Sequence, residues 1–274
     1  MKMAVREFTR EFEGFAAALG VRNGKDGADY VFPDFALRVT PVTLEQAGNM
    51  GFILHLIDAE VGTEHRILLY EDRWLGDESG ALKKRLAACL GKFRSVFARK
   101  CAVSRTDILT ANAFLDKCHS YGAASAKYKY SLTFDGELVA VATFSGKKRL
   151  PSMDHSYPGT KISCEWIRYA SLPDVRVSGG MGKMLKAFMK DVDPEEVLSY
   201  SDNEWSKGEV YGKLGFTRMF RTPPQEYYVN KKTYGRISAI KVGRDNLYKG
   251  REFPSSDYWR IYNAGSTRWF LEKT

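Results

Sequence analysis

The feature that most constrains the fold is a hairpin signature in the middle of the chain. Two strand-like runs, KYKYSLTF from Lys127 and ELVAVATFS from Glu137, are joined by Asp135-Gly136. Asp-Gly favours a type I′ turn, because both central residues of that turn adopt positive φ. The sequence therefore predicts an antiparallel pair of strands around which this region is organised.

The segments after the hairpin alternate between strand and helix. A strand (161–171), a glycine-rich turn leading into a helix (177–190), a buried strand (197–201), a short helix (206–215) and two closing strands (216–220 and 226–230) are expected. This order predicts a mixed α/β fold, formally α/β or α+β, with helices flanking the sheet.

The N-terminal part is less regular. Helical spacing is present at 8–19 and 108–118, and a basic helix is expected at 82–97. The runs YVFPDFALRV (30–39), GFILHLID (51–58) and RILLYED (66–72) predict strands.

Positive charge is concentrated in two regions. The chain has a net charge of +9; residues 79–106 hold eight Lys/Arg and no acid, and residues 205–274 hold fourteen Lys/Arg and six Asp/Glu. Such regions suit a polyphosphate backbone, although a solvated basic surface is an equal alternative. With DNA as partner, the expected contacts are Lys83, Lys84, Arg85, Arg99, Lys100, Lys231, Lys232 and Arg236.

Cysteine and histidine patterns predict no metal site. Four cysteines occur without a close pair and four histidines without ligand spacing, so neither a zinc site nor a disulfide framework is expected. Because no run of about 18 apolar residues or signal core is present, we expect a soluble, cytoplasmic protein without membrane contact. The sequence does not predict the oligomeric state.

The glycine-rich turn and two titratable side chains are the candidates for chemistry. Gly180 and Gly182 precede a helix, where backbone N–H groups and the helix dipole favour a phosphate or pyrophosphate; an ordinary loop is the alternative. Glu165 could act as general base and Tyr211 as general acid. Alternatively, Tyr211 packs beneath the sheet.

The hairpin, strand, glycine-rich turn, helix and YGKLGF resemble the GNAT family of N-acetyltransferases. The resemblance implies that the turn holds acetyl-CoA or another acyl-CoA, that Tyr211 protonates the leaving thiolate and that Glu165 deprotonates the amine. The family's Arg/Gln-x-x-Gly-x-Gly/Ala pattern puts Val177 where Arg or Gln is expected, with Arg176 one place away. The implied cofactor-binding residues are Val177, Ser178, Gly179, Gly180, Met181, Gly182 and Lys183.

A second resemblance covers residues 64 to 274. FLDKCHSYG, DGELVAVATFS, EWIRYAS, SYSDNEWSKGEVYGKLGF and RIYNAGSTRWFL resemble the C-terminal part of phage proteins described as Hef-like homing endonucleases. The phage Mom DNA-modification group is more distantly similar. This resemblance implies a phage-encoded protein that acts inside the host cell.

The resemblance also implies an N-terminal part similar to Vsr-like nucleases. Asp29 matches the metal-binding Asp and Pro33-Asp34 a Pro-Glu pair, but the second acid falls near Thr40, which cannot bind a metal as a carboxylate would. We therefore interpret residues 1–75 as a shortened nuclease-like region without its chemistry. Residual cleavage through Asp29, Asp34 and Asp58 is the weakest alternative.

These expectations combine into one organisation: a nuclease-like domain with a basic helix (1–105), a GNAT-like domain (106–232) and a basic extension (233–274). The favoured function is acyl-CoA-dependent acylation of a nucleobase or a nucleotide-linked amine, without a metal. A non-catalytic DNA-binding module is the alternative. Besides Glu165 and Tyr211, we expect Asp202 to be catalytic and Asn203, Trp205 and Arg168 to contact substrate.

Overall fold

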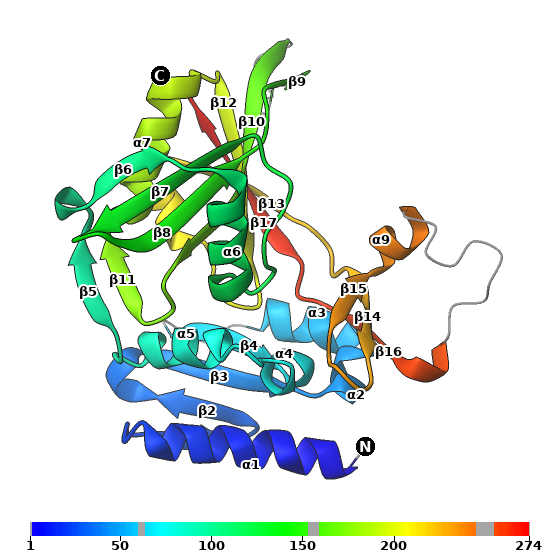
Figure 1. Cartoon of the computed structure of the whole chain (residues 1–274). Helices are drawn as coiled ribbons and strands as arrows, with labels where there is room; N and C mark the ends of the chain where they lie inside the picture. The colour runs from blue at the N-terminus through cyan, green and yellow to red at the C-terminus, as the bar shows by residue number, and fades with distance from the viewer. Residues whose placement is uncertain (1, 60–63, 153–158, 245–254, 274) are drawn as a thin grey trace. The chain divides into compact units, whose positions relative to one another are not determined.

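The computed structural model describes residues 2–59, 64–152, 159–244 and 255–273 (Figure 1). The chain forms two compact units, each assembled from separate stretches: unit 1 from Met1–Glu78, Asp202–Lys207 and Arg221–Thr267, and unit 2 from Ser79–Ser201, Gly208–Phe220 and Arg268–Thr274. The boundaries expected at residues 105 and 232 fall inside unit 2 and unit 1. Within the described ranges, no helix combines the length and apolar character needed to cross a membrane.

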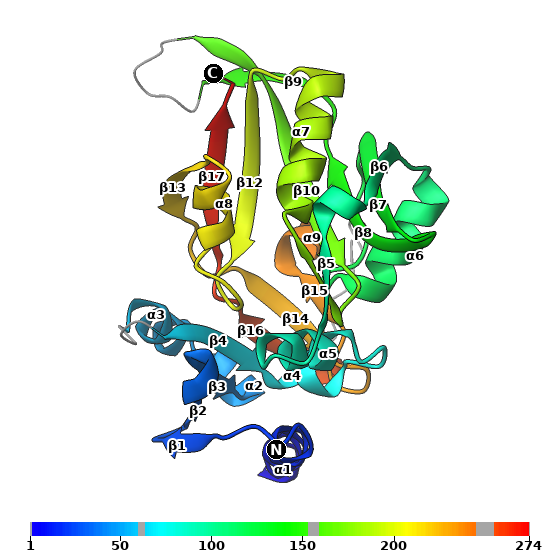
Figure 2. The same ribbon diagram turned by 90° about the vertical axis from the view of Figure 1, so that its left-hand side faces the viewer.

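Unit 2 is built on a mixed eight-stranded sheet (Figure 2). The strand order is β13-β17-β12-β10-β8-β7-β6, and β9 pairs with β10. The strands are β6 (Ala102–Arg105), β7 (Tyr128–Phe134), β8 (Glu137–Phe144), β9 (Lys148–Pro151), β10 (Thr160–Ser171), β12 (Glu196–Asp202), β13 (Thr217–Arg221) and β17 (Ser266–Glu272). Asp135 and Gly136 have φ values of 49° and 82°, so the hairpin prediction is confirmed.

Two helices cover opposite faces of this sheet. Alternate residues of β8 divide between them: Phe144 stacks on Phe188 of α7 (Gly180–Val192) with ring centroids 3.8 Å apart, whereas Val141 packs with Leu115 of α6 (Ile108–Cys118). Burying one such aromatic side chain contributes about 1.5–3 kcal/mol. The predicted mixed α/β fold with flanking helices is therefore confirmed in unit 2.

The basic helix expected at 82–97 is only partly correct. Helix α5 (Ala81–Cys89) ends before Gly91, which has a φ of 79°. Residues Arg94–Phe97 form β5, which pairs in parallel with β11 (Val175–Ser178), and the 3₁₀ turn η2 (Ala98–Lys100) follows. Tertiary pairing with β11 thus overrides helical spacing and draws this basic segment into unit 2.

Unit 1 contains two smaller sheets. The first has the order β1-β2-β3-β4 and the second β15-β14-β16. The elements are α1 (Lys2–Ala18), β1 (Gly24–Asp26), β2 (Asp29–Phe32), η1 (Pro33–Phe35), β3 (Leu37–Val42), α2 (Leu44–Ala47), α3 (Met50–Asp58), β4 (His65–Tyr70), α4 (Glu71–Leu75), β14 (Glu226–Asn230), β15 (Arg236–Ser238), α9 (Ala239–Arg244), η3 (Ser255–Asp257) and β16 (Tyr258–Tyr262).

Two strand predictions are corrected. GFILHLID forms helix α3, because the Asn49 side chain accepts a hydrogen bond from the Phe52 amide at 3.1 Å and caps the helix. EYYVN forms β14 of unit 1 and does not close the sheet of unit 2. The edge strand is the predicted β13, and β17 from the chain end lies between it and β12, with Trp269 buried in the core of unit 2.

Candidate functional site

The glycine-rich turn joins β11 to helix α7. Gly179 is the N-cap, has a φ of 79° and makes no side-chain capping hydrogen bond. The Lys183 amide donates to the Gly179 carbonyl at 3.0 Å, which is the first bond of the helix. The amides of residues 180–182 therefore have no acceptor within the helix, and together with the helix dipole they favour an anion.

Packing and backbone conformation also account for glycines in this turn. A Cβ on Gly180 would lie 2.7 Å from the Tyr169 hydroxyl, and one on Gly182 would lie 3.2 Å from Leu214. Close packing therefore explains Gly180 without any ligand, whereas a Cβ on Gly182 needs only a small shift of the Leu214 side chain. Only Gly179 is required by its backbone, because its positive φ strains other residues.

The side chains of the turn are largely engaged. Val177 is buried and pairs with Val96 of β5, so it offers no donor where the family pattern has Arg or Gln. The Lys183 ammonium donates to the carbonyl of Ala98 at 2.9 Å and to that of Cys101, which ties η2 to α7. Anion binding at this turn would thus come from backbone amides.

Cationic side chains of β11 and η2 flank the turn. Arg176 does not replace the missing residue, because its guanidinium lies 4.1 Å from the ring centroid of Phe93. Arg99 and Lys100 of η2 are exposed. Their neighbour Ala98 has its Cβ 3.7 Å from the position that a Gly179 Cβ would take, so η2 adjoins the turn directly.

The pairing of β10 with β12 stops partway along both strands. They pair in parallel only from Ser163↔Glu196 to Glu165↔Leu198. On the other side, β10 shifts register against β8 between Trp166 and Arg168. Past Glu165, β10 therefore has no backbone partner in β12, and the Trp166 carbonyl instead accepts from the Ser199 hydroxyl at 3.2 Å.

Tyr211 lies at this point on helix α8 (Glu209–Lys213). Its hydroxyl is 2.9 Å from the Ser199 Oγ and 3.5 Å from the Tyr200 carbonyl, to which it donates. Its ring stacks on Trp269, with centroids 5.6 Å apart. Burial raises the pKa of Tyr211, against the opposing effect of the Ser199 hydrogen bond, so the phenol is protonated at neutral pH. Tyr211 therefore packs beneath the sheet, with its hydroxyl bonded to β12.

Glu165 is the last residue of β10 that pairs with β12, and its carboxylate is exposed. Its backbone amide donates to the Ser145 Oγ at 2.8 Å. Its partner Leu198 immediately precedes Ser199, which bonds to Tyr211. The fold thus brings both predicted acid–base residues to the place where the pairing ends.

Arg168 has a structural role. Its Nε donates to the Gly122 carbonyl at 3.1 Å, and its guanidinium lies over the Tyr121 ring. It fastens the loop after α6 to the sheet, so its guanidinium is already engaged.

The segment Asp202–Lys207 belongs to unit 1, whereas Glu165 and Tyr211 belong to unit 2. Asn203 donates to the Ala264 carbonyl at 3.1 Å and accepts from Thr267 at 2.8 Å, so both ends of its amide are occupied. Trp205 is only 5% exposed, and the structure gives no open indole face for stacking. The Asp202 carboxylate accepts from the Glu204 amide at 2.9 Å. These side chains build a turn of unit 1.

Arg236 is the one expected DNA contact that the structure contradicts. Its side chain is 3% exposed and binds Asp72 at 2.5 and 3.0 Å and Glu204 at 2.9 Å. A guanidinium committed to two buried carboxylates cannot also reach a phosphate. Among the remaining expected contacts, Lys83 is half-buried and the others are exposed: Lys84, Arg85, Arg99, Lys100, Lys231 and Lys232.

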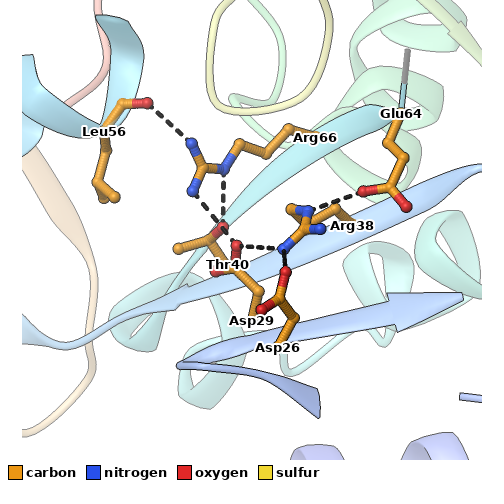
Figure 3. Close-up of polar contacts among 7 residues, drawn as sticks. All are labelled: Asp26, Asp29, Arg38, Thr40, Leu56, Glu64 and Arg66. Atoms are coloured by element: carbon orange, nitrogen blue, oxygen red, sulfur yellow. Dashed lines mark hydrogen bonds and ion pairs between the residues drawn. The ribbon is translucent and has the colours of Figure 1, made fainter. Parts of the chain in front are cut away.

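The three acids of the nuclease alternative lie in separate ion pairs. Asp29 accepts from Arg38 at 3.1 Å and from Arg66 at 3.4 Å, and the Thr40 hydroxyl accepts from Arg66 at 2.9 Å (Figure 3). Two guanidinium groups therefore lie where the nuclease resemblance implies a metal ion. The other two acids pair elsewhere: Asp34 with Arg22, and Asp58 with Arg221.

The donor set does not fit a catalytic metal. Of the residues that the structure describes, no three His, Cys, Asp or Glu side chains cluster so as to hold an ion. Asp29 shares the Arg38 guanidinium with Asp26 and Glu64, so an arginine occupies the centre of this group of acids (Figure 3).

Sequence reasoning missed two members of these clusters. Ser199 links Tyr211 to β10, and Glu204 holds Arg236. A serine inside the apolar run VLSYS was a visible signal for the first. The second had no signal, because its partner is remote in sequence.

Comparison with known proteins gives structural similarity only. No protein-family model matches the sequence, and no curated protein matches it. Chains of solved structures match in 44 cases. An acetyltransferase from Bacillus subtilis in complex with CoA is 15% identical, with 64% of this chain and 100% of that chain covered and a TM-score of 0.36.

Two further matches have similar values. A GNAT family acetyltransferase from Elizabethkingia anophelis with acetyl-CoA bound is 11% identical over 64% of this chain and 99% of its own, with a TM-score of 0.37. The ribosomal-protein-S18-alanine N-acetyltransferase from Escherichia coli is 12% identical over 63% and 93%, with a TM-score of 0.36. Similarity at this level assigns neither an activity nor a substrate.

Proposed function

We propose that unit 2 is an acyl-CoA-dependent N-acyltransferase whose acceptor is an amine of DNA, either on a nucleobase or linked to a nucleotide. The observation that carries the proposal is the protonated Tyr211 hydroxyl at the point where β10 and β12 cease to pair. A buried phenol beside unpaired strand backbone suits a general acid better than a purely structural side chain.

The residues of unit 2 fit an acyl-CoA. The uncapped amides of residues 180–182 suit its pyrophosphate, and the exposed cations Arg99 and Lys100 adjoin them. Beyond Glu165, β10 makes no ladder bond to β12. The carbonyls of Trp166, Ile167 and Arg168 already accept side-chain hydrogen bonds, so the pantetheine arm of the acyl-CoA would pair with backbone amides of β10. When bound, the acyl-CoA supplies an activated thioester carbonyl.

The chemistry assigned to the chain is a pair of proton transfers. Glu165 accepts a proton from the acceptor amine as its nitrogen forms a bond to the carbonyl carbon. Tyr211 donates its proton to the sulfur as the carbon–sulfur bond breaks. Ser199 positions the phenol through its hydroxyl.

Support for DNA as the acceptor comes from charge. The η2 cations Arg99 and Lys100 are exposed and lie in a sequence stretch without acids, whereas Arg94 of β5 pairs with Glu137. Because each neutralised phosphate releases counterions, binding would weaken steeply with salt.

A second candidate function is a DNA-binding module without acyl transfer. It is favoured by Val177 at the position of the family's Arg or Gln, and by packing that already explains Gly180. This candidate predicts salt-dependent DNA affinity that is unchanged by Tyr211→Phe.

The test measures thiol release from acetyl-CoA in the presence of single-stranded and duplex DNA. Tyr211→Phe is expected to slow release by roughly 10²-fold or more, since it removes a general acid. Tyr228→Phe, on β14 of unit 1, is the control and should retain the wild-type rate. No thiol release by the wild type, with salt-dependent DNA binding intact, would favour the binding module.

A further inference from the structure

We propose that the face of strands β13, β17 and β12 opposite helix α8 binds single-stranded nucleic acid through Tyr200, Arg268 and Phe220. These strands are neighbours in unit 2 (Figure 2), and each contributes one of the residues. The Arg268 guanidinium lies 5.9 Å from the ring centroid of Tyr200 and 5.7 Å from that of Phe220. The result is a ring–cation–ring row across the sheet.

Strand alternation sets the face of this row. Ser201 on β12 accepts a hydrogen bond from the Trp269 indole on β17, and that indole stacks on Tyr211 of α8. Because successive side chains of a strand point to opposite faces, Tyr200 and Arg268 lie on the other face. The row is therefore separate from the packed side of the sheet.

Two properties of the row have no role within unit 2. The rings of Tyr200 and Phe220 are 41% and 51% exposed, although aromatic surface is normally buried. The Nε of Arg268 is buried without a hydrogen-bond partner, and its guanidinium makes no hydrogen bond or ion pair with any described residue. Arg268 therefore has no counter-charge among the described residues, and a phosphate on this face would supply one.

A nucleic acid strand matches this order of groups. Its bases have flat faces that stack on exposed aromatic rings, and its phosphates pair with arginine. Arg218 is exposed and precedes Phe220 by two residues, so it shares the face and adds a second cation. Duplex DNA does not fit, because its bases are already stacked on one another. This surface goes beyond the proposed acyl transfer and does not depend on it.

The experiment titrates the full chain into a fluorescein-labelled oligo(dT) of about 12 nucleotides and follows anisotropy. Tyr200→Ala and Phe220→Ala are each expected to weaken binding by about 5- to 100-fold. Tyr200→Leu should lose as much, because leucine keeps apolar area but has no π face. Leu109→Ala is the control: Leu109 is 80% exposed on α6, a helix that carries none of the residues expected to contact nucleic acid.

Several results would overturn the proposal. These are full affinity in both alanine variants, an equal loss in Leu109→Ala, equally tight binding of a duplex of the same length, or competition by AMP at the same nucleotide concentration. Unchanged thermal melting would show that the exposed-ring variants are folded. Calorimetric CoA binding by Phe220→Ala should equal that of the wild type, so this proposal and the acyltransferase proposal can fail separately.

Discussion

The buried arginine of unit 1 offers a test with a large expected effect. The Arg236 side chain makes three hydrogen bonds to Asp72 and Glu204, whose side chains are 0% and 2% exposed. Its guanidinium also lies 4.7 Å from the ring centroid of Tyr70. Arg236→Met leaves two buried carboxylates without a counter-charge, which costs about 3–5 kcal/mol of unfolding free energy.

The measurement is urea unfolding of the variant and the wild type. With an m-value of about 2 kcal/mol/M, the expected loss lowers the midpoint by roughly 2 M. Arg22→Ala is the control, because Arg22 and Asp34 are 70% and 53% exposed and such pairs contribute about 0–1 kcal/mol. Arg236→Lys should be intermediate, since it keeps the charge but loses the two-pronged contact.

The loss of unfolding free energy in Arg236→Met should be smaller at acidic pH. Burial raises the pKa of Glu204, and Arg236 opposes that rise. Without the guanidinium the folded variant therefore binds more protons than the unfolded chain. Its unfolding free energy therefore falls as pH rises and recovers as pH falls. A loss below about 1 kcal/mol, or lower DNA affinity with unchanged stability, would refute the buried ion-pair assignment.

Three further predictions concern other parts of the chain. Gly179→Ala should cost about 1–2 kcal/mol by thermal unfolding, because its φ of 79° is left-handed; no loss would contradict this turn geometry. Burial raises the pKa of Glu71 above 4.5, although a hydrogen bond from the Leu44 amide opposes the rise. Above pH 4.5 the folded chain therefore binds more protons than the unfolded chain. The contribution of Glu71 to the unfolding free energy declines as pH rises through the raised pKa. In chemical unfolding at pH 4–7, Glu71→Gln should lack that decline, and an identical pH profile would contradict it. Asp29→Asn should leave plasmid cleavage with Mg²⁺ at the same background level as the wild type, because Asp29 forms an ion pair with Arg38. Cleavage by the wild type that this substitution abolishes would support the nuclease alternative.

Local signals in the sequence predicted the centre of unit 2 well. Asp135-Gly136 sets a turn by its own backbone preference, and the run 161–171 is long and apolar enough to be a strand wherever it packs. The glycine-rich turn before α7 was also predictable from the sequence, because the positive φ of Gly179 favours glycine.

Predictions failed where remote partners decide the structure. Residues 94–97 become a strand only because β11 lies beside them, and β17 enters the sheet from the chain end. Arg236 carries the same local signal as a surface arginine, and only the fold brings Asp72 and Glu204 to it. Trp205 was expected to touch substrate, but its burial depends on the packing of unit 1.

The central claim is that the turn before α7 binds an acyl-CoA, and calorimetric titration with CoA tests it most directly. Ser178 is exposed beside the uncapped amides, so Ser178→Glu adds a negative charge to the turn and Ser178→Gln is its neutral match. We predict micromolar binding by the wild type, similar binding by Ser178→Gln and about tenfold or weaker binding by Ser178→Glu, because a carboxylate repels phosphates at this distance. No heat from the wild type at high micromolar CoA, or equal affinity in Ser178→Glu, would contradict the claim.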